Sequence, residues 1–230
     1  MMQKFMKTAV SIKFLIFFMV MGCFSDPQNP NNLNPKSIAQ MDILEATKSN
    51  NVEQVTSWIE NKRNVNKQDT DGNTPLHYAT YNQNLVIAKL LVEAGANVNT
   101  QNNNVDSPFL FAGAEGMTEF VKLYLSHGAD FSVYNRYNGT ALIPACEKGH
   151  VATVRLLANT PNFPINHINR LGWTALMETV ILSDGSKNYQ EIIKILLKAG
   201  ADKNIPDKDG TTALEHAEQR NFKAIVNLLK

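Results

Sequence analysis

Apolar residues recur at matching positions from about residue 38 to residue 230, in successive copies of one pattern. The first matching column is Leu76, Phe109, Leu142, Leu176 and Leu214. The second column, three residues further on, is Ala79, Ala112, Ala145, Thr179 and Ala217. A spacing of three residues places both columns on one face of a helix. The small residues of the second column let neighbouring helices approach closely.

Two more apolar columns follow in each copy, again three residues apart. They are Ile87, Phe120, Thr153, Ile192 and Ile225, and then Leu90, Leu123, Leu156, Ile195 and Leu228. This spacing predicts a second helix whose apolar face packs against the adjacent copy. Gly-Ala-Asn or Gly-Ala-Asp turns at 95–97, 128–130 and 200–202 then lead into a polar segment. Each copy is therefore predicted to form two short antiparallel helices and a protruding hairpin.

Polar residues at fixed positions predict where the first helix of a copy begins and ends. Thr74, Thr140 and Thr174 come at its start, where a threonine hydroxyl can accept a hydrogen bond from a free backbone N–H. Pro75 fits the first helical turn because its missing N–H costs nothing there. Gly116 follows the first helix of its copy, at a position that favours a left-handed backbone.

The stretch Asp71-Gly72-Asn73-Thr74-Pro75-Leu76-His77-Tyr78-Ala79 recurs, with changes, about every 33 residues. Counterparts of its second half begin at Ser107, Thr140, Thr174 and Thr212. A period of this length with a Thr-Pro-Leu-His core resembles the ankyrin repeat. The resemblance implies an all-α solenoid of about six helix-turn-helix repeats with short β-hairpin fingers. It also implies that His77 is structural, hydrogen-bonded within its own turn and to the next repeat.

The repeat domain is predicted to span residues 38–230. Its repeats fall near 38–70, 71–103, 104–136, 137–169, 170–207 and 208–230, the first and last of them acting as caps with one face in water. The fifth repeat holds five extra residues, around 183–189 and between its two helices. We expect this insertion to be a solvated loop.

The N-terminal segment has the pattern of an export signal. Residues 1–22 combine three lysines with a short apolar run, too short to span a bilayer, and predict a signal peptide. Gly22-Cys23 resembles the lipidation motif of bacterial lipoproteins, so a lipid on Cys23 is expected, with ordinary signal cleavage nearby as the alternative. Residues 23–37 are polar and proline-rich, which indicates a disordered tether.

Charge and cysteine content narrow the class of partner. The chain has 22 basic and 21 acidic residues, and without the three lysines of the leader 19 basic residues face 21 acidic ones. A nucleic-acid binder needs a clustered basic surface, so we expect no nucleic-acid partner. The two cysteines lie in unlike contexts, and we expect no disulfide.

Aromatic and charged residues at the predicted hairpin tips and first-helix ends are the candidate partner-binding residues, because such residue types dominate protein interfaces. They are Tyr81, Glu115, Tyr134, Arg136, Tyr137, Lys148, Arg170 and Trp173. Trp173 has a second interpretation, in which it packs on the adjacent hairpin. We expect one protein partner, a monomeric chain, and membrane contact only through a lipid on Cys23.

Side chains with catalytic potential are scattered. His127, His150, His167 and His216 occupy unlike positions, and no pair has the close spacing of a helical zinc site, so we expect no metal and no cofactor. Cys146 has no recognisable base beside it, which favours a buried inert thiol over a nucleophile. We therefore expect no catalytic residue.

The export signal, the Gly172-Trp173-Thr174 stretch and the lengthened loop are similar to small exported bacterial ankyrin-repeat proteins. That resemblance implies a non-catalytic adaptor, inhibitor or stress-related partner protein in the bacterial cell envelope. It would lie in the periplasm or be anchored as a lipoprotein, with secretion as the alternative. Two other functions stay open: an enzyme or redox factor using Cys146 or the histidines, and a purely structural envelope protein.

Overall fold

A computed structural model describes residues 41–230 of the chain. The predicted signal peptide, the tether and the lipidation of Cys23 lie outside the described residues. Within residues 41–230 there are twelve helices and no strand.

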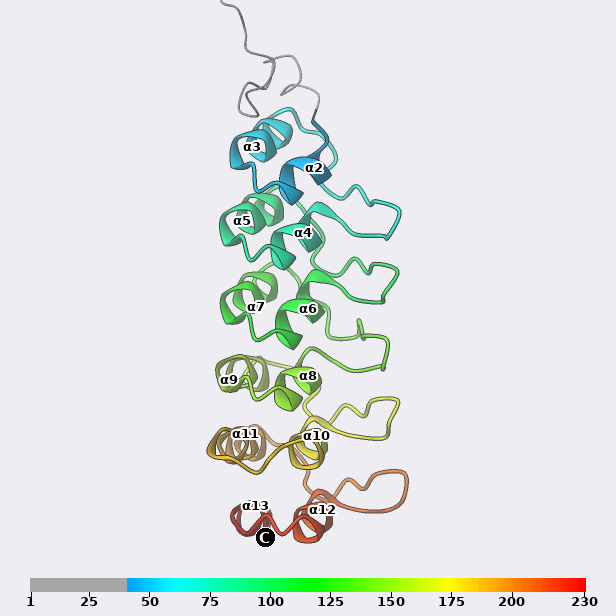
Figure 1. Ribbon diagram of the computed structural model, residues 1–230, viewed down its shortest axis with the longest axis vertical. Coiled ribbons are helices and arrows are strands. Elements are labelled where there is room, and N and C mark those ends of the chain that lie inside the picture. The colour runs from blue at the N-terminus through cyan, green and yellow to red at the C-terminus, as the bar shows by residue number, and fades with distance from the viewer. Residues whose placement is uncertain (1–40) are drawn as a thin grey trace, which may run out of the picture. The chain divides into compact units, whose positions relative to one another are not determined.

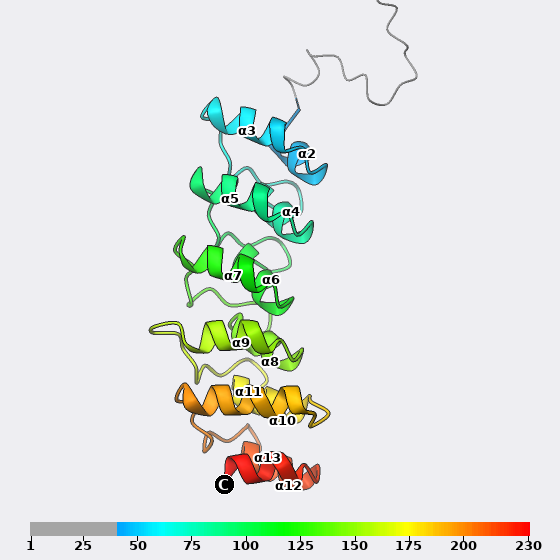
Figure 2. The same ribbon diagram turned by 90° about the vertical axis from the view of Figure 1, so that its left-hand side faces the viewer.

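The helices form six antiparallel pairs that stack in one direction (Figure 1). The inner helices are α2 Ile43–Lys48, α4 Pro75–Tyr81, α6 Pro108–Ala114, α8 Leu142–Glu147, α10 Ala175–Ile181 and α12 Ala213–Gln219. The outer helices are α3 Val52–Glu60, α5 Leu85–Glu93, α7 Thr118–Leu125, α9 Val151–Ala158, α11 Lys187–Lys198 and α13 Lys223–Leu229. Inner helices pack on inner helices and outer on outer, so two layers run along the array (Figure 1). Figure 2 shows the array from the side of the outer helices.

The long segments that join each outer helix to the next inner helix project on the inner-helix side (Figure 1). We call them the fingers; they span residues 61–74, 94–107, 126–141, 159–174 and 199–212. The all-α repeat architecture is confirmed, but the fingers contain turns and no regular strand among the described residues.

One aspartate or asparagine builds the tip of each finger. In the first finger the Asp69 backbone N–H donates to the Asn73 carbonyl at 3.0 Å. The Asp69 side chain accepts from the backbone N–H groups of Asp71 and Asn73. The same contacts recur at the four later tips, around Asn102, Asn135, Asn169 and Asp207. A side chain that satisfies two local N–H groups shapes the turn without a β-ladder.

The predicted helix starts are confirmed in most repeats. Thr74 accepts from the backbone N–H of His77, and Thr174 accepts from that of Met177. Pro75 occupies the first turn of α4, as expected. At the other end of the inner helices, Gly116 takes a left-handed backbone with a φ of 69°.

The prediction that Thr140 caps its helix is wrong. Its hydroxyl is buried and has no hydrogen-bond partner among the described residues, and α8 begins only at Leu142. Pro144 has no N–H to donate to the Thr140 carbonyl, which explains why α8 begins late; the structure gives no reason for the missing bond to the Thr140 hydroxyl. In the neighbouring repeats the bond to the carbonyl is present, for example from Glu178 N–H to the Thr174 carbonyl at 2.9 Å.

His77 has the predicted structural role. Its Nδ1 accepts from the Thr74 backbone N–H at 3.0 Å, and its Nε2 donates to the Asp106 carbonyl of the next finger at 3.0 Å. The ring is fully buried, and burial lowers the pKa of the His77 imidazole. A neutral ring can donate at one nitrogen and accept at the other, which these two contacts require.

The outer helices bury a different stripe from the predicted one. Ile87 and its counterparts are fully or almost fully buried, as expected. The column of Leu90 is mostly not: Ile195 is buried, but Leu90, Leu123, Leu156 and Leu228 are only half-buried. The residues one position later are buried instead: Leu91, Tyr124, Leu157, Leu196 and Leu229. An α-helix has 3.6 residues per turn, so the residues three and four positions after Ile87 lie on opposite sides of one apolar stripe. In the stacked array the residue four positions on is the buried one.

Two polar replacements in the core are matched by hydrogen bonds. Thr153 takes the place of an apolar residue, and its hydroxyl lies 2.8 Å from that of Thr118 in the preceding outer helix. Tyr124 replaces a leucine, and its hydroxyl lies 2.7 Å from that of Thr80 on α4. Each pair satisfies a buried hydroxyl that would otherwise destabilise the array.

The insertion in the fifth repeat is only partly a solvated loop. Part of it extends α11, which has 12 residues where the other outer helices have seven to nine. Tyr189 reaches back to the preceding repeat, where its hydroxyl donates to the Glu147 carbonyl at 3.0 Å. Ser183 is buried, and its carbonyl accepts from the Arg220 guanidinium of the next repeat. The insertion therefore links three repeats.

Exchanging adjacent leucines for alanine tests which side of the outer helix is buried. Leu157→Ala should lower the free energy of unfolding by roughly 2–5 kcal/mol, because it leaves a cavity between repeats. Leu156→Ala is the matched control and should cost clearly less, because that side chain is only partly buried. Urea unfolding followed by circular dichroism measures both; equal losses would contradict the assignment.

Candidate functional site

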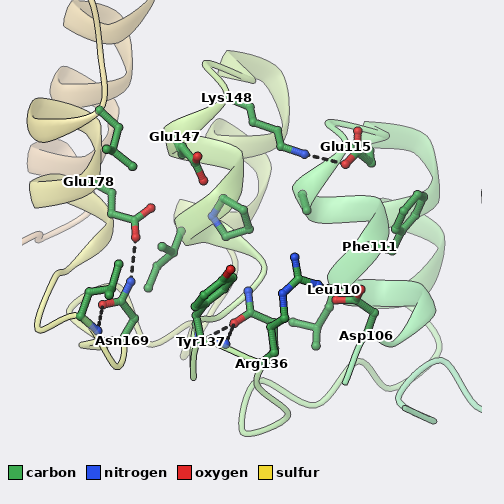
Figure 3. A pocket seen from close by; sticks show the side chains of 17 residues that line it. Asp106, Leu110, Phe111, Glu115, Arg136, Tyr137, Glu147, Lys148, Asn169 and Glu178 are labelled. Atoms are coloured by element: carbon green, nitrogen blue, oxygen red, sulfur yellow. Dashed lines mark hydrogen bonds and ion pairs between the residues drawn. The ribbon is translucent and has the colours of Figure 1, made fainter. Parts of the chain in front are cut away.

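A hollow of about 570 Å³ opens on the finger side of the array, over α6, α8 and α10 (Figure 3). Residues from these inner helices, from three fingers and from the ends of the inner helices line it. We call this space the hollow. The residues that define it here are Asp106, Phe111, Glu115, Arg136, Tyr137, Glu147, Lys148, Asn169, Leu171, Glu178 and Leu182.

The repeat register explains why these side chains converge. Tyr137 and Leu171 hold the same position on successive finger tips, three residues before Thr140 and Thr174. Glu115, Lys148 and Leu182 hold the same position after successive inner helices. Stacking brings equivalent positions next to one another, so a feature that spans several repeats needs only local changes in each.

The rim of the hollow is apolar at three places. Tyr137 is 51% exposed, and Leu171 and Leu182 are each 46% exposed. Six large apolar side chains of the described chain are at least 40% exposed, and they are Val86, Val105, Tyr137, Ile168, Leu171 and Leu182. Only Val86 lies on the outer layer. Exposed apolar area is therefore concentrated on the finger side, where a partner could cover it.

Two ion pairs cross the hollow. The Lys148 ammonium lies 2.6 Å from the Glu115 carboxylate, and the Arg136 guanidinium lies 3.8 Å from that of Asp106. Burial raises the pKa of the Asp106 carboxyl, and the Arg136 charge opposes this shift. Since the side chains of the Lys148 pair are about 40% exposed, water weakens that attraction.

Two further carboxylates in the hollow have no cation within salt-bridge distance among residues 41–230. Figure 3 shows Glu147 on α8 and Glu178 on α10 directed into the same space. Glu147 is exposed, whereas Glu178 is only 5% exposed. One oxygen of Glu178 accepts from the Asn169 side-chain amide at 2.7 Å. Its second oxygen accepts no hydrogen bond from the described residues.

The surroundings of Glu178 favour its protonated form. Burial is the largest cause, and together with the Glu147 charge it raises the pKa of Glu178 to about 7. The hydrogen bond from Asn169 opposes the shift. No cation contributes to the shift of the Glu178 pKa. Near neutral pH this carboxyl therefore changes charge readily.

Four of the eight predicted partner-binding residues line the hollow, namely Glu115, Arg136, Tyr137 and Lys148. The other four, Tyr81, Tyr134, Arg170 and Trp173, do not line it. Tyr81 lies on α4, where its ring packs edge-on against Phe111 at 4.6 Å between centroids. Its hydroxyl accepts from the Asn102 amide, and burial raises its pKa to about 12. These contacts indicate a packing role for Tyr81.

The remaining three lie in the fingers. Tyr134 stacks on His167 of the next finger, with 4.3 Å between ring centroids and 15° between planes. Arg170 is exposed, and its carbonyl accepts from the Lys208 ammonium of the following finger. Trp173 is half-buried, and its backbone N–H donates to the Asn169 side chain. Which of these residues touches a partner stays a prediction.

Sequence reasoning overlooked Glu147, Asn169, Leu171, Glu178 and Leu182. A signal for two of them was present in the repeat alignment. Counterparts of Leu182 are Asn82, Glu115, Lys148 and Arg220, and counterparts of Leu171 are Asp71, Asn104, Tyr137 and Asp209. A leucine at a position that is polar in most other repeats marks exposed apolar surface. The pair of Glu178 with Asn169 had no such signal.

The other chemical candidates lie in unpromising places. Cys146 is fully buried, as predicted, and burial raises the pKa of its thiol. A buried thiol in its neutral form is a poor nucleophile. Within residues 41–230, no three His, Cys, Asp or Glu side chains gather closely enough to hold a metal ion. In the same range, no helix has the length and apolar content needed to cross a membrane.

Comparison with known proteins identifies the repeat. A family model for ankyrin repeats in three copies matches residues 43–135 and 109–207. The putative ankyrin repeat protein YahD of Escherichia coli K12 is 43% identical over 94 residues, which are 41% of this chain and 47% of YahD. The chain thus matches about half the length of this curated relative.

Solved structures resemble nearly the whole array. The ankyrin repeat protein EF0377 is 42% identical and an ankyrin repeat domain from Acinetobacter baumannii AYE is 45% identical. Each match covers 81% of this chain and 95% of the other, with a TM-score of 0.79. A chain in the structure of the predatory endopeptidase Bd0816 from Bdellovibrio bacteriovorus in complex with immunity protein Bd3460 is 26% identical, over 81% and 95%, with a TM-score of 0.63.

Glu178→Gln tests the electrostatic state of the hollow. Because the folded-state pKa is raised, the folded protein holds its proton to higher pH than the unfolded chain. The stability penalty is absent below the unfolded pKa near 4.5, grows as pH rises, and is complete above about 7. Glutamine can still accept from Asn169 but carries no charge. The variant should therefore be more stable than the wild type by roughly 1–3 kcal/mol at about pH 8.

The same variant should gain little at about pH 5, where Glu178 is mostly protonated in the fold. Urea unfolding at both pH values measures the difference. Glu119→Gln, an exposed carboxylate on the outer helix α7, is the control and should change stability little at either pH. A gain for Glu178→Gln that does not depend on pH would show that charge is not its cause.

Proposed function

The chain belongs to the ankyrin-repeat family, and we propose that it is a non-catalytic protein-binding protein of the bacterial cell envelope. Ankyrin repeats are protein–protein interaction modules. The proposed binding surface is the finger side of the array, centred on the hollow between α6 and α10.

The distribution of exposed apolar side chains is the observation that carries this proposal. Five of the six most exposed large apolar residues lie on the fingers or at the end of an inner helix, and one lies on the outer layer. Protein interfaces combine an apolar centre with aromatic and arginine side chains. The hollow offers Tyr137, Leu171, Leu182 and Arg136 in that combination.

Restraint of a partner enzyme is the mode of action that we favour. A structurally similar chain occurs in a complex of an endopeptidase with an immunity protein. A rigid array binds such a partner without large rearrangement, because its surface is built from packed helices. An enzymatic role for the chain itself has less support, since Cys146 is out of reach of a substrate.

The cell-envelope location is proposed from the sequence alone. Residues 1–22 have the pattern of a signal peptide, and Cys23 stands where a lipoprotein would be acylated. Two or more acyl chains would hold the protein on a membrane stably. The polar segment 23–37 would then act as a tether between lipid and array.

Site-specific photo-crosslinking in the native cell tests the binding surface. A photoreactive amino acid in place of Tyr137 should form a covalent adduct with a partner protein, because this exposed side chain lies at the rim of the hollow. Val86 is the matched control, since it is 58% exposed but lies on the outer helix α5. Adducts are detected as a mass increase on a denaturing gel and identified by mass spectrometry.

The expected result is an adduct at position 137 and none at position 86. Adducts at both positions in equal amounts, or at position 86 alone, would remove the finger side as the binding surface. A chain that crosslinks at neither position would act as a structural protein instead.

The intact mass of the protein extracted from membranes tests the location. Acylation should add the mass of two or three fatty acyl chains to a chain that begins at Cys23. Cys23→Ser should abolish the addition and shift the protein to the soluble envelope fraction. An unmodified mature chain in the soluble fraction of the wild type would replace the lipoprotein assignment with a freely diffusing exported protein.

A further inference from the structure

We propose that the hollow receives an arginine or lysine side chain of the bound protein, held between Glu147 and Glu178, while apolar residues beside it cover Tyr137, Leu171 and Leu182. The inference rests on the proposed protein-binding function and adds the chemistry of the partner segment. It predicts a basic residue flanked by apolar ones.

The charges of the hollow are unbalanced in one direction. Four acidic side chains line it, and two basic ones, Arg136 and Lys148, are each paired with one of them. Glu147 and Glu178 are left without a cation among the described residues. A partner that brings a positive charge would complete the pattern, because complementary charge favours binding and excludes wrong partners.

Glu178 is the stronger half of this argument. Its side chain is almost fully buried, yet one carboxylate oxygen accepts no hydrogen bond from residues 41–230 and faces the hollow (Figure 3). This oxygen is not enclosed by the protein and is accessible from the hollow. A donor from a bound segment would satisfy this oxygen.

The bond between Glu178 and Asn169 is the reverse of its counterparts. In the second and sixth repeats the finger contributes an aspartate, which accepts from Tyr78 or contacts the His216 ring at 2.7 Å. The fifth repeat places the amide on the finger and the carboxylate on the helix. A hydrogen bond between finger and inner helix could also be made with the carboxylate on the finger, which would place no negative charge on the helix beneath the hollow.

Retaining this charge lowers stability, because burial and Glu147 both oppose ionisation of Glu178. Features that reduce stability persist where they serve binding or catalysis. The charge is therefore better explained by a bound cation than by the fold.

Size and shape agree with a side chain and its neighbours. The hollow has about 570 Å³, within the range of roughly 300–1,000 Å³ found for ligand sites. Glu147 and Glu178 approach from two different helices, α8 and α10. A guanidinium, with five donors in a plane, can bond to both, which favours arginine over lysine.

A peptide titration tests the proposal without knowledge of the partner. The probe is acetyl-Leu-Arg-Leu-amide, added to the isotope-labelled protein at about pH 8, above the raised pKa of Glu178. The neutral control is the same peptide with citrulline, which has nearly the shape of arginine but no charge. Protein NMR signals of Gly139, Asn169 and Leu171 report on the hollow.

We expect the arginine peptide to shift these signals and the citrulline peptide to bind roughly tenfold more weakly, the factor that one charge-assisted hydrogen bond supplies. Glu178→Gln and Glu147→Gln should each weaken the arginine peptide by a similar factor. Glu119→Gln, on the outer layer, should leave its affinity unchanged. Circular dichroism confirms that each variant is folded.

The proposal is overturned if neither peptide shifts signals in the hollow, or if both bind equally well to wild type and Glu178→Gln. In that event, crosslinks at position 137 would still support the protein-binding function with different partner chemistry. Absence of crosslinks at position 137 would instead remove the binding surface itself.

Discussion

Packing of each helix pair on the next is the interaction on which the whole array depends. A single pair cannot bury its apolar stripe alone, so Leu76, Leu142 and their counterparts become fully covered only when neighbouring repeats stack on them. His77 adds a hydrogen bond from one repeat to the next finger. Because all these contacts are between neighbours, the core constrains one side of each helix and leaves the finger side free to vary.

The hollow follows from that freedom. Positions on the finger side have no core partner, so residues there can change without loss of packing. Tyr137, Leu171 and Leu182 replace polar residues of other repeats, and each brings apolar surface to the same region. Stacking places equivalent positions of successive repeats next to one another. One substitution in each of three repeats is therefore enough to build a continuous site.

Glu178 shows how the requirements of stability and binding separate. A finger must be tied to its inner helix, and in three repeats a hydrogen bond between residues nine apart does this. The tie needs one donor and one acceptor but does not need a particular direction. Placing the acceptor on the helix leaves a carboxylate in a poorly solvated position, where its charge destabilises the free protein and can bind a cation.

The sequence by itself determined the repeat architecture, the helix pairs and most helix starts, because these depend on local periodicity and capping. The role of His77 followed from the resemblance of its motif to the ankyrin repeat. The sequence also singled out Glu115, Arg136, Tyr137 and Lys148, which the structure brings together around the hollow, from their residue types and repeat positions. Only the tertiary structure decided that Leu157 rather than Leu156 is buried, because stacking selects one side of the stripe. It alone brought Glu147 and Glu178 together, because their proximity depends on two helices that are separated by a finger and a complete outer helix.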